Sequence, residues 1–584
     1  LGVSLYRSKN GGKTFAQEGN RGVHSDQHAL WIDPRDGRHM IIGCDGGFYQ
    51  TYDRAEHWDH LNHLALGQFY HVAVDPRPVY RALGGLQDNG SWAGPTRTLR
   101  PGGPINEDWL TIGGGDGFVC RVDPRDPDLV YSESQGGAIQ RRHLKTGERA
   151  MLRPKRVPGR AAYRFNWNTP FILSSHNPSI FYSAGQYVFR SVERGDRLRI
   201  ISPEITRTSH GSATALAESP RNPDLLYVGT DDGALWVTRD GGGHWTDIRA
   251  NVKLPGPRWV ATIEPSRYVD GRAYVAFDAH RSNDEEPYVY VTEDYGQAWK
   301  SIRSNLPIGS ARVCREDIQN PDLLYVGTEF AAWVSANRGV SWTKLNNNLP
   351  TVAIHELAQH PTSGELVAAT HGRSLWVLDV TPLRQMTATV LKDKVHLYQP
   401  NPVVRWRLEQ GREGMFAGAE RKFVGQNPPP GAQVYYALTH KAESAALKIM
   451  DHTGKQVAEL TAETAPGLHR ANWALTQGRS RRGPGAARPA EQGTPGAGGQ
   501  GAQGGAGRPG AAAAAGQRPP VPVPEPQQET PELPSFFGGA QQIKPGVYRV
   551  VLTVDGKEHS QWLRIEGDPA ETTMVIATDD DEEP

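Results

Sequence analysis

The sequence repeats a nine-residue phrase at a regular interval. NPDLLYVGT occurs at Asn222–Thr230 and again, unchanged, at Asn320–Thr328. Weaker copies begin at Asp36, Asp126, Asn177, Asp270 and Ser363. Successive copies lie about 45 to 50 residues apart, which is the period of propeller repeats. Each copy is a turn motif followed by alternating apolar residues, a pattern that predicts a β-strand. The repeat therefore predicts a β-propeller, in which four-stranded blades close into a ring.

A second signature follows most copies of the phrase. It reads apolar-x-Ser/Thr-x-Asp/Asn-x-Gly-x-x-Trp and occurs at Trp236–Ile248, Tyr290–Ile302 and Trp333–Leu345. Leu5–Gln17 is a fourth copy, and Tyr49–Leu61 and Phe189–Ile201 are degenerate copies. The pattern predicts a hairpin turn in which the Asp or Asn caps backbone N–H groups, Gly adopts φ > 0 and the Trp covers the turn. We interpret it as a folding device at the outer rim and not as a catalytic site.

The units define the expected domains. Eight of them run from about residue 26 to 380, preceded by half a unit at residues 1–19. This half unit either completes the ring by pairing elsewhere or belongs to an earlier propeller, and we favour the second interpretation. Residues 1–66 are then the end of a preceding propeller or its first blades, and residues 67–382 form a ring of seven to eight blades.

A different pattern begins after Pro382. Strand-like stretches with Asp-x-x-Gly turns predict an immunoglobulin-like β-sandwich over residues 383–477 and 535–570. Residues 478–534 are so rich in Gly, Ala and Pro that we expect a disordered insertion, and residues 571–584 form an acidic tail. The expected fold class is all-β, a propeller followed by a sandwich.

Composition excludes several classes of partner. Lys plus Arg and Asp plus Glu both number 64, so the net charge of zero gives no electrostatic reason to expect nucleic acid binding. We find no apolar run near the roughly 20 residues that a membrane helix requires. The three cysteines, Cys44, Cys120 and Cys314, lie in separate repeats and predict no disulfide framework.

Several phrases resemble a family of bacterial repeat proteins. They are HALWIDP (His28–Pro34), DGGFYQTYD (Asp45–Asp53), GGLQDNGSW (Gly84–Trp92), GGGDGF (Gly113–Phe118), RFNWNTP (Arg164–Pro170) and THGRSLWVLD (Thr370–Asp379). With the second signature, which resembles the Asp-box, they make residues 24–380 similar to BNR-repeat proteins labelled glycosyl hydrolase-like or sortilin-like. The resemblance implies an exported protein that is secreted, periplasmic or on the cell surface. It also implies two propellers followed by an immunoglobulin-like domain.

Aligning the repeats places one polar residue per unit at the start of the loop after the second strand. These residues are Asp45, Asp88, Glu133, Gln186, Asp231, Asp278, Glu329 and His371. The alignment predicts a polar, mostly acidic ring at the channel mouth, able to bind a sugar, a cation or a basic peptide. The alternative is that these side chains cap the backbone of their loops.

A pair of carboxylates is the strongest catalytic hypothesis. Asp88 and Asp116 lie on Gly-rich loops of the same blade region, and Asp45 is the substitute partner. Glycosidases use two carboxyl groups, about 5–5.5 Å apart for retention or 6.5–9.5 Å for inversion. The related tandem-propeller xyloglucanases cleave β-glucans with two aspartates between propellers, which is what the resemblance implies for this pair. Turn-capping aspartates are the alternative.

The neighbouring loops supply candidate substrate-binding groups. Aromatic rings able to stack on pyranose rings are Trp92, Trp109, Phe118 and Trp167, unless they belong to the core. Polar groups able to bind a substrate are Asn166, Asn168, Asp231, Glu329 and His371. The His spacings fit no zinc site, so we expect no metal and no cofactor; the acidic loop Arg281–Pro287 is the one candidate for Ca²⁺.

Two functions remain open. The first is a glycoside hydrolase that acts on polysaccharide with two aspartates on the channel face. The second is a non-catalytic propeller scaffold that recognises a protein, peptide or glycan through the same face or through the sandwich.

Overall fold

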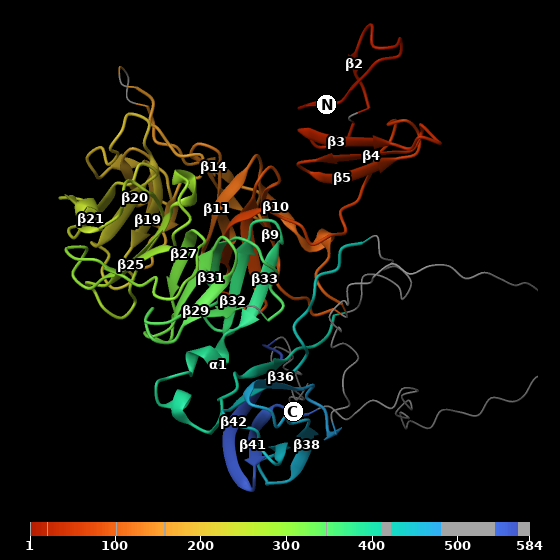
Figure 1. Ribbon diagram of the computed structural model, residues 1–584, viewed down its shortest axis with the longest axis vertical. Helices are drawn as coiled ribbons and strands as arrows, with labels where there is room; N and C mark the ends of the chain where they lie inside the picture. Colours follow the sequence, from red (N-terminus) through yellow and green to blue (C-terminus); the bar gives the residue numbers. More distant parts are fainter. Residues whose placement is uncertain are drawn as a thin grey trace, which may run out of the picture.

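The computed structural model describes residues 2–19, 21–100, 102–156, 159, 161–345, 347–409, 422–479 and 543–569. The chain forms a small N-terminal pair of sheets, a large ring of sheets and a C-terminal sandwich (Figure 1). The expected fold class, an all-β propeller followed by a β-sandwich, is confirmed. The expected acidic tail and all but the first two residues of the expected insertion lie outside the described residues. No helix in the described ranges is both long and apolar enough to span a membrane.

Seven antiparallel sheets make up the ring. The first sheet contains β7 (Phe69–Val74), β8 (Arg81–Leu86), β9 (Gly90–Pro95) and β10 (Leu110–Gly113), and the second contains β11 (Gly117–Asp123), β12 (Asp126–Ser134), β13 (Ala138–His143) and β14 (Arg149–Met151). The third contains β15 (Phe171–Leu173), β16 (Phe181–Ala184), β17 (Val188–Ser191) and β18 (Arg199–Ile200), and the fourth contains β19 (Ala213–Glu218), β20 (Leu226–Thr230), β21 (Leu235–Thr238) and β22 (Thr246–Asp247). The fifth contains β23 (Trp259–Pro265), β24 (Ala273–Asp278), β25 (Tyr288–Thr292) and β26 (Lys300–Ser301), and the sixth contains β27 (Ala311–Glu316), β28 (Leu324–Thr328), β29 (Ala332–Ser335) and β30 (Thr343–Leu345). The seventh contains β31 (Ile354–Gln359), β32 (Glu365–Thr370) and β33 (Leu375–Asp379).

The first strand of each sheet lies innermost and lines the axis of the ring. The ring closes where β7 meets β31 and β32. Phe69 and Val72 of the first sheet share an apolar cluster with Val367 and Ala369 of the last, and one isolated bridge joins Gln68 to His371. The last sheet has three strands, so side-chain packing forms this seam and no described strand crosses it.

The second signature forms hairpins at the outer strands. In the copy after β21, the Asp240 carboxylate accepts hydrogen bonds from the Thr238 hydroxyl and the His244 amide, both at 2.8 Å. Gly242 has a φ of 101°, which L side chains rarely adopt. The Trp245 indole donates to the Ile201 carbonyl at 2.7 Å, and Ile201 belongs to the loop after the preceding sheet. Trp342 makes the same kind of bond, to the Ile302 carbonyl, so these two Trp residues tie their hairpins to the neighbouring blade.

The N-terminal region forms its own sheets and does not extend the ring. β1 (Tyr6–Arg7) pairs with β2 (Ala16–Gln17). A second, four-stranded sheet contains β3 (Gln27–Ile32), β4 (Met40–Cys44), β5 (Gly47–Thr51) and β6 (Asp59–His60). Leu5, Ile42 and Tyr49 form the small core between these two sheets. The alternative in which residues 1–19 complete the ring is therefore not what the structure shows.

The C-terminal domain packs two sheets around one core. The smaller sheet contains β34 (Val395–Leu397), β36 (Ala432–Leu438) and β39 (Gly467–Trp473). The larger contains β35 (Val403–Arg405), β42 (Lys557–Gly567), β41 (Gly546–Val554), β37 (Ala445–Met450), β38 (Gln456–Leu460) and β40 (Gly478–Arg479). Tyr436 and Trp473 from one sheet meet Leu447, Val550 and Leu552 from the other.

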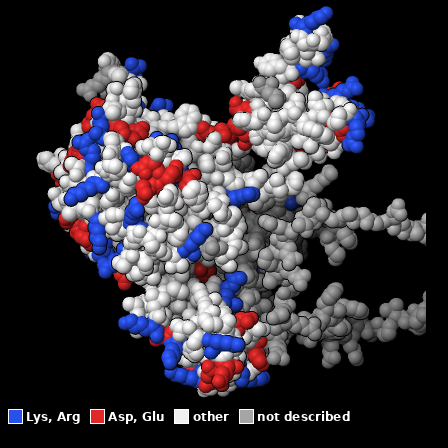
Figure 2. All heavy atoms as spheres, viewed as in Figure 1, with Lys and Arg blue, Asp and Glu red and all other residues white. Residues whose placement is uncertain are grey.

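A short helix connects the ring to the sandwich. It is α1 (Thr381–Arg384), and the remaining helical turns are η1 (Asn106–Asp108), η2 (Arg249–Asn251), η3 (His280–Ser282) and η4 (Val390–Lys392). Arg384 of α1 donates to the Asp317 carboxylate at 2.9 Å, and both side chains are buried. On the visible face, basic and acidic side chains are interspersed over the ring and the sandwich (Figure 2), as the balanced composition predicts.

Candidate functional site

The structure brings Asp88 and Asp116 into contact. Asp88 lies in the turn between β8 and β9 with φ of 62°, and Asp116 lies just before β11. The Asp88 amide donates to Oδ1 of Asp116 at 2.7 Å. Glycines permit this approach, because a Cβ at Gly117 would lie 2.3 Å from the Gly90 carbonyl oxygen. The Gly-rich phrase before β11 thus places one carboxylate against the loop that carries the other.

The neighbouring carboxylates affect the protonation of Asp88. Burial, a hydrogen bond with Asp116 and the negative charges of Asp116 and Asp45 together raise the pKa of Asp88 to about 6. Two acids in contact do not both ionise readily, so Asp88 holds its proton under mildly acidic conditions. The 2.7 Å contact joins the Asp88 backbone amide to the Asp116 carboxylate, so it is not a measure of the separation of the two carboxyl groups, and the glycosidase spacing stays a prediction for this pair.

Asp116 is a buried carboxylate with both oxygens engaged. Its Oδ2 accepts a hydrogen bond from the Trp167 indole at 2.9 Å, while Oδ1 accepts from the Asp88 amide. Asp116 is 9% exposed, whereas Trp167 is 60% exposed. The arrangement leaves Asp116 to hold its neighbours in place and presents the indole ring to solvent.

Asp45 approaches the pair from the N-terminal sheet. It lies in the turn between β4 and β5, and its Oδ1 contacts Nε2 of His28 at 2.7 Å. The Asn89 amide donates to the Asp45 carbonyl, and the His24 ring donates to the Asp88 carbonyl, both at 3.0 Å. Among the described residues, no further side chain bonds the second oxygen of the Asp45 carboxylate. Asp45 is therefore the open carboxylate of the three predicted ones.

The other predicted aromatic residues are packed into the protein. Phe118 is 1% exposed and its ring lies 4.5 Å from that of Tyr70, so the expected stacking on a sugar is wrong for this residue. The Trp109 ring lies against Gly94 of β9, and the Trp92 indole donates to the Asn89 carbonyl at 2.7 Å. Of the four aromatic candidates, Trp167 alone is largely exposed.

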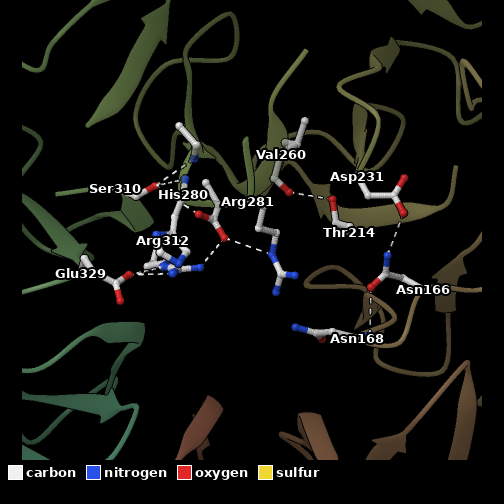
Figure 3. A network of polar contacts seen from close by, with 12 residues as sticks. Asn166, Asn168, Thr214, Asp231, Val260, His280, Arg281, Ser310, Arg312 and Glu329 are labelled. Atoms are coloured by element: carbon white, nitrogen blue, oxygen red, sulfur yellow. Dashed lines mark hydrogen bonds and ion pairs between the residues drawn. The ribbon is translucent and has the colours of Figure 1, made fainter. Parts of the chain in front are cut away.

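Several members of the predicted polar ring hydrogen-bond to loops of the protein: Glu133 to its own loop, and Asp231 and Gln186 to other loops. Asp231 accepts hydrogen bonds from the Ser212 amide at 2.8 Å and from the Asn166 amide group at 3.0 Å (Figure 3). Glu133 accepts from the Gly137 amide, and Gln186 accepts from the Arg164 amide. The capping alternative describes these positions.

Arginines neutralise the other side of the ring. Arg312 donates to Glu329 at 2.6 Å and also contacts Asp278, and Arg281 donates to Asp278 at 3.3 Å (Figure 3). His371 stacks on the His355 ring with the centroids 4.3 Å apart. The channel mouth is therefore not the mostly acidic surface that the alignment predicts. The sequence analysis missed the arginines because they do not recur at one position of the repeat.

Asn168 lies deeper in the channel. Its side-chain amide contacts Nε2 of His71 at 3.0 Å, and Nδ1 of His71 contacts Glu356 at 3.2 Å. Asn168 is thus part of the polar wall of the channel and not of the Asp88 site.

Comparisons with known proteins found one distant structural likeness. Neither a protein-family model nor a curated protein matches the sequence. Among solved structures, the chain is similar to the GH74 xyloglucanase from Xanthomonas campestris, with 16% sequence identity and a TM-score of 0.42. The likeness covers 55% of this chain and 53% of that one, so the chain spans about half the length of that enzyme. At this distance the likeness carries no argument about activity.

Proposed function

We propose that the protein hydrolyses a polysaccharide at the junction between the N-terminal sheet and the ring, with Asp88 as the general acid. The observation that carries the proposal is the environment of Asp88. Its pKa is raised to about 6, chiefly by burial and by Asp116, so that it keeps a transferable proton under mildly acidic conditions, up to about pH 6. General acids in enzymes are tuned in this way.

Asp116 serves as the positioning residue of this site. Its carboxylate accepts the Asp88 amide and the Trp167 indole, which fixes the acid relative to an exposed aromatic ring. Its negative charge also favours the protonated form of Asp88. Substrate would stack on Trp167, because indole faces bind the apolar face of a pyranose ring.

Asp45 and His28 supply the base. In the proposed step, Asp88 donates its proton to the glycosidic oxygen, the bond from that oxygen to the anomeric carbon breaks, and the alcohol leaves. A water molecule gives its proton to Asp45, and the remaining hydroxide oxygen bonds to the anomeric carbon. The contact with His28 at 2.7 Å orients the Asp45 carboxylate.

A hydrolysis assay of the full chain on a panel of polysaccharides tests the proposal. We expect Asp88→Asn and Asp45→Asn each to lower kcat by about 100-fold or more. The matched control is Asp322→Asn, whose carboxylate is 57% exposed and pairs with Arg338 on the surface. Full activity in Asp88→Asn would rule out the assigned acid.

A second function, recognition without catalysis, is favoured by one observation. The Trp167 ring is 60% exposed, whereas both oxygens of Asp116 are already engaged, so the site offers a ring on which a ligand can stack without any reaction. Glycan binding to the wild-type chain without release of any product would support this function over hydrolysis.

A further inference from the structure

The axis of the ring contains a cavity that the proposed hydrolase site does not use. Its volume is about 520 Å³, and it is lined by the inner strands of all seven sheets. Small side chains keep it open, since Ala73, Ala261 and Ala358 face it from β7, β23 and β31. Cavities of this size hold small-molecule ligands.

A charged cluster crosses the cavity. Arg315 of β27 donates to Glu356 at 2.7 Å and to Glu264 at 3.1 Å. Glu356 also contacts His71 at 3.2 Å. Although burial opposes the shift, the charges of Arg315 and His71 lower the pKa of Glu356 to about 2. Glu356 is thus an ionised carboxylate that already has two partners.

Arg121 lacks such a partner. It lies on β11 and lines the same cavity, and its one hydrogen bond among the described residues runs from Nη1 to the Cys120 carbonyl at 2.8 Å. No described carboxylate lies within ion-pair distance of it. Burial and the charge of Arg315 lower the pKa of Arg121 despite Glu356 nearby. A guanidinium carries five N–H donors in a planar fork, so most of the donors of Arg121 are free to face the cavity.

We infer that this cavity binds a small organic monocarboxylate, held by a bidentate contact with Arg121. The planar fork of Arg121 matches the two oxygens of a carboxylate. The nearby Glu356 disfavours ligands with a higher negative charge, because like charges repel strongly in a buried site. The Thr214 hydroxyl lines the cavity and donates to the Val260 carbonyl at 2.7 Å, so its oxygen is left to accept a hydrogen bond from a hydroxyl group of the ligand, and a sugar acid suits the site.

The test of the cavity site does not depend on the proposed hydrolysis, because it measures equilibrium binding and not a reaction. The test is calorimetric titration of the full chain with sodium glucuronate, with glucose as the neutral control and inorganic phosphate as the second anion. We expect glucuronate to bind at least 10-fold more tightly than glucose or phosphate. Arg121→Gln should lower the glucuronate affinity at least 10-fold, and Arg121→Lys should fall between Arg121→Gln and wild type.

Two further variants guard against a folding defect. Ala261→Leu fills the cavity without touching Arg121 and should also abolish binding. Arg35→Gln removes a guanidinium that is 87% exposed on the surface and should leave the affinity unchanged. Equal binding by Arg121→Gln and wild type would overturn the inference, as would wild-type protein that does not bind glucuronate. Phosphate binding that depends on Arg121, in the absence of glucuronate binding, would overturn the assignment to a carboxylate.

Discussion

The indole N–H of Trp167 donates a 2.9 Å hydrogen bond to Oδ2 of Asp116, although Trp167 is 60% exposed and Asp116 is 9% exposed. A surface ring is thereby fixed to a buried acid. The bond restricts the indole to one orientation before any ligand arrives, which reduces the entropy lost on binding.

We expect Trp167→Ala to weaken glycan binding about 5-fold, because stacked aromatic contacts contribute about 1 kcal/mol. Trp167→Phe keeps a ring but loses the bond to Asp116, so its affinity should lie between those of the alanine variant and the wild type. Affinity electrophoresis on each polysaccharide of the assay panel measures the effect. Trp562→Ala is the control, since Trp562 is equally exposed but lies in the sandwich. An identical loss in both variants would argue against a site at Trp167.

The stability of the protein should depend on Asp88 in a pH-dependent way. Its folded pKa of about 6 lies above its ordinary value of 3.8, so the fold binds the proton more tightly than the unfolded chain. This contribution is complete below pH 3.8 and is lost as the pH rises through about 6. Asp88→Asn should therefore raise Tm by about 2 °C at pH 8 and by less at pH 5. Asn also tolerates the positive φ at this position. A Tm difference that does not change with pH would contradict the assignment.

The pH profile of hydrolysis should report the same proton. Activity should fall above about pH 6, where Asp88 loses its proton. Asp116→Asn removes one negative charge and one of the causes of the raised pKa, so the alkaline limb should move to lower pH by about one unit. Initial rates from pH 4 to pH 9 measure this. An alkaline limb that stays in place in the variant would show that another group controls it.

The buried pair between Arg384 and Asp317 should contribute strongly to stability. Their side chains are 5% and 0% exposed, and Arg384→Met would leave the Asp317 charge without its partner. We expect a loss of about 3–5 kcal/mol in the free energy of unfolding, measured by urea denaturation. The pair Arg338–Asp322 has side chains 51% and 57% exposed, so Arg338→Met should cost less than about 1 kcal/mol.

The rim tryptophans should hold neighbouring blades together. Trp342 is 4% exposed and donates to the Ile302 carbonyl at 2.8 Å. Trp342→Ala should destabilise the ring by about 3–5 kcal/mol, whereas Trp342→Phe loses the hydrogen bond and should cost nearer 1 kcal/mol. Urea midpoints of the two variants give the comparison. Equal midpoints for wild type and Trp342→Ala would mean that this contact does not join the blades.

Most of the fold could be predicted from the repeat, because the repeated phrase marks the same strand in every blade. The two identical phrases became β20 and β28, which both run from the buried Leu of the phrase to its Thr. The proximity of Asp88 and Asp116 also followed from the sequence, because adjacent Gly-rich loops of neighbouring blades meet on one face. What the repeat shares among its copies could be predicted.

Features that differ between the copies of the repeat could not be predicted. Arg121 and Arg315 both end the phrase Val-Cys-Arg, on the inner strands of different blades, but the phrase does not show that its Arg faces a cavity on the axis. Phe118 was assigned to a surface loop, yet β11 begins at Gly117 and turns the next side chain into the core. The contact of Asp45 with the Asp88 loop depends on how a separate sheet docks, which no local pattern in one sequence encodes.

The seam between the first and last sheets has a mechanical consequence. Phe69 and Val72 meet Val367 and Ala369 there, and one bridge joins Gln68 to His371, with no strand shared across the joint. The chain itself connects the two sheets at each of the other six joints but not at this one, so under tension the circle should open here and become an arc. Residues of both β7 and β31 line the axial cavity, so a ligand bound there would connect the two sheets. Ligand binding should therefore raise the force needed to separate them.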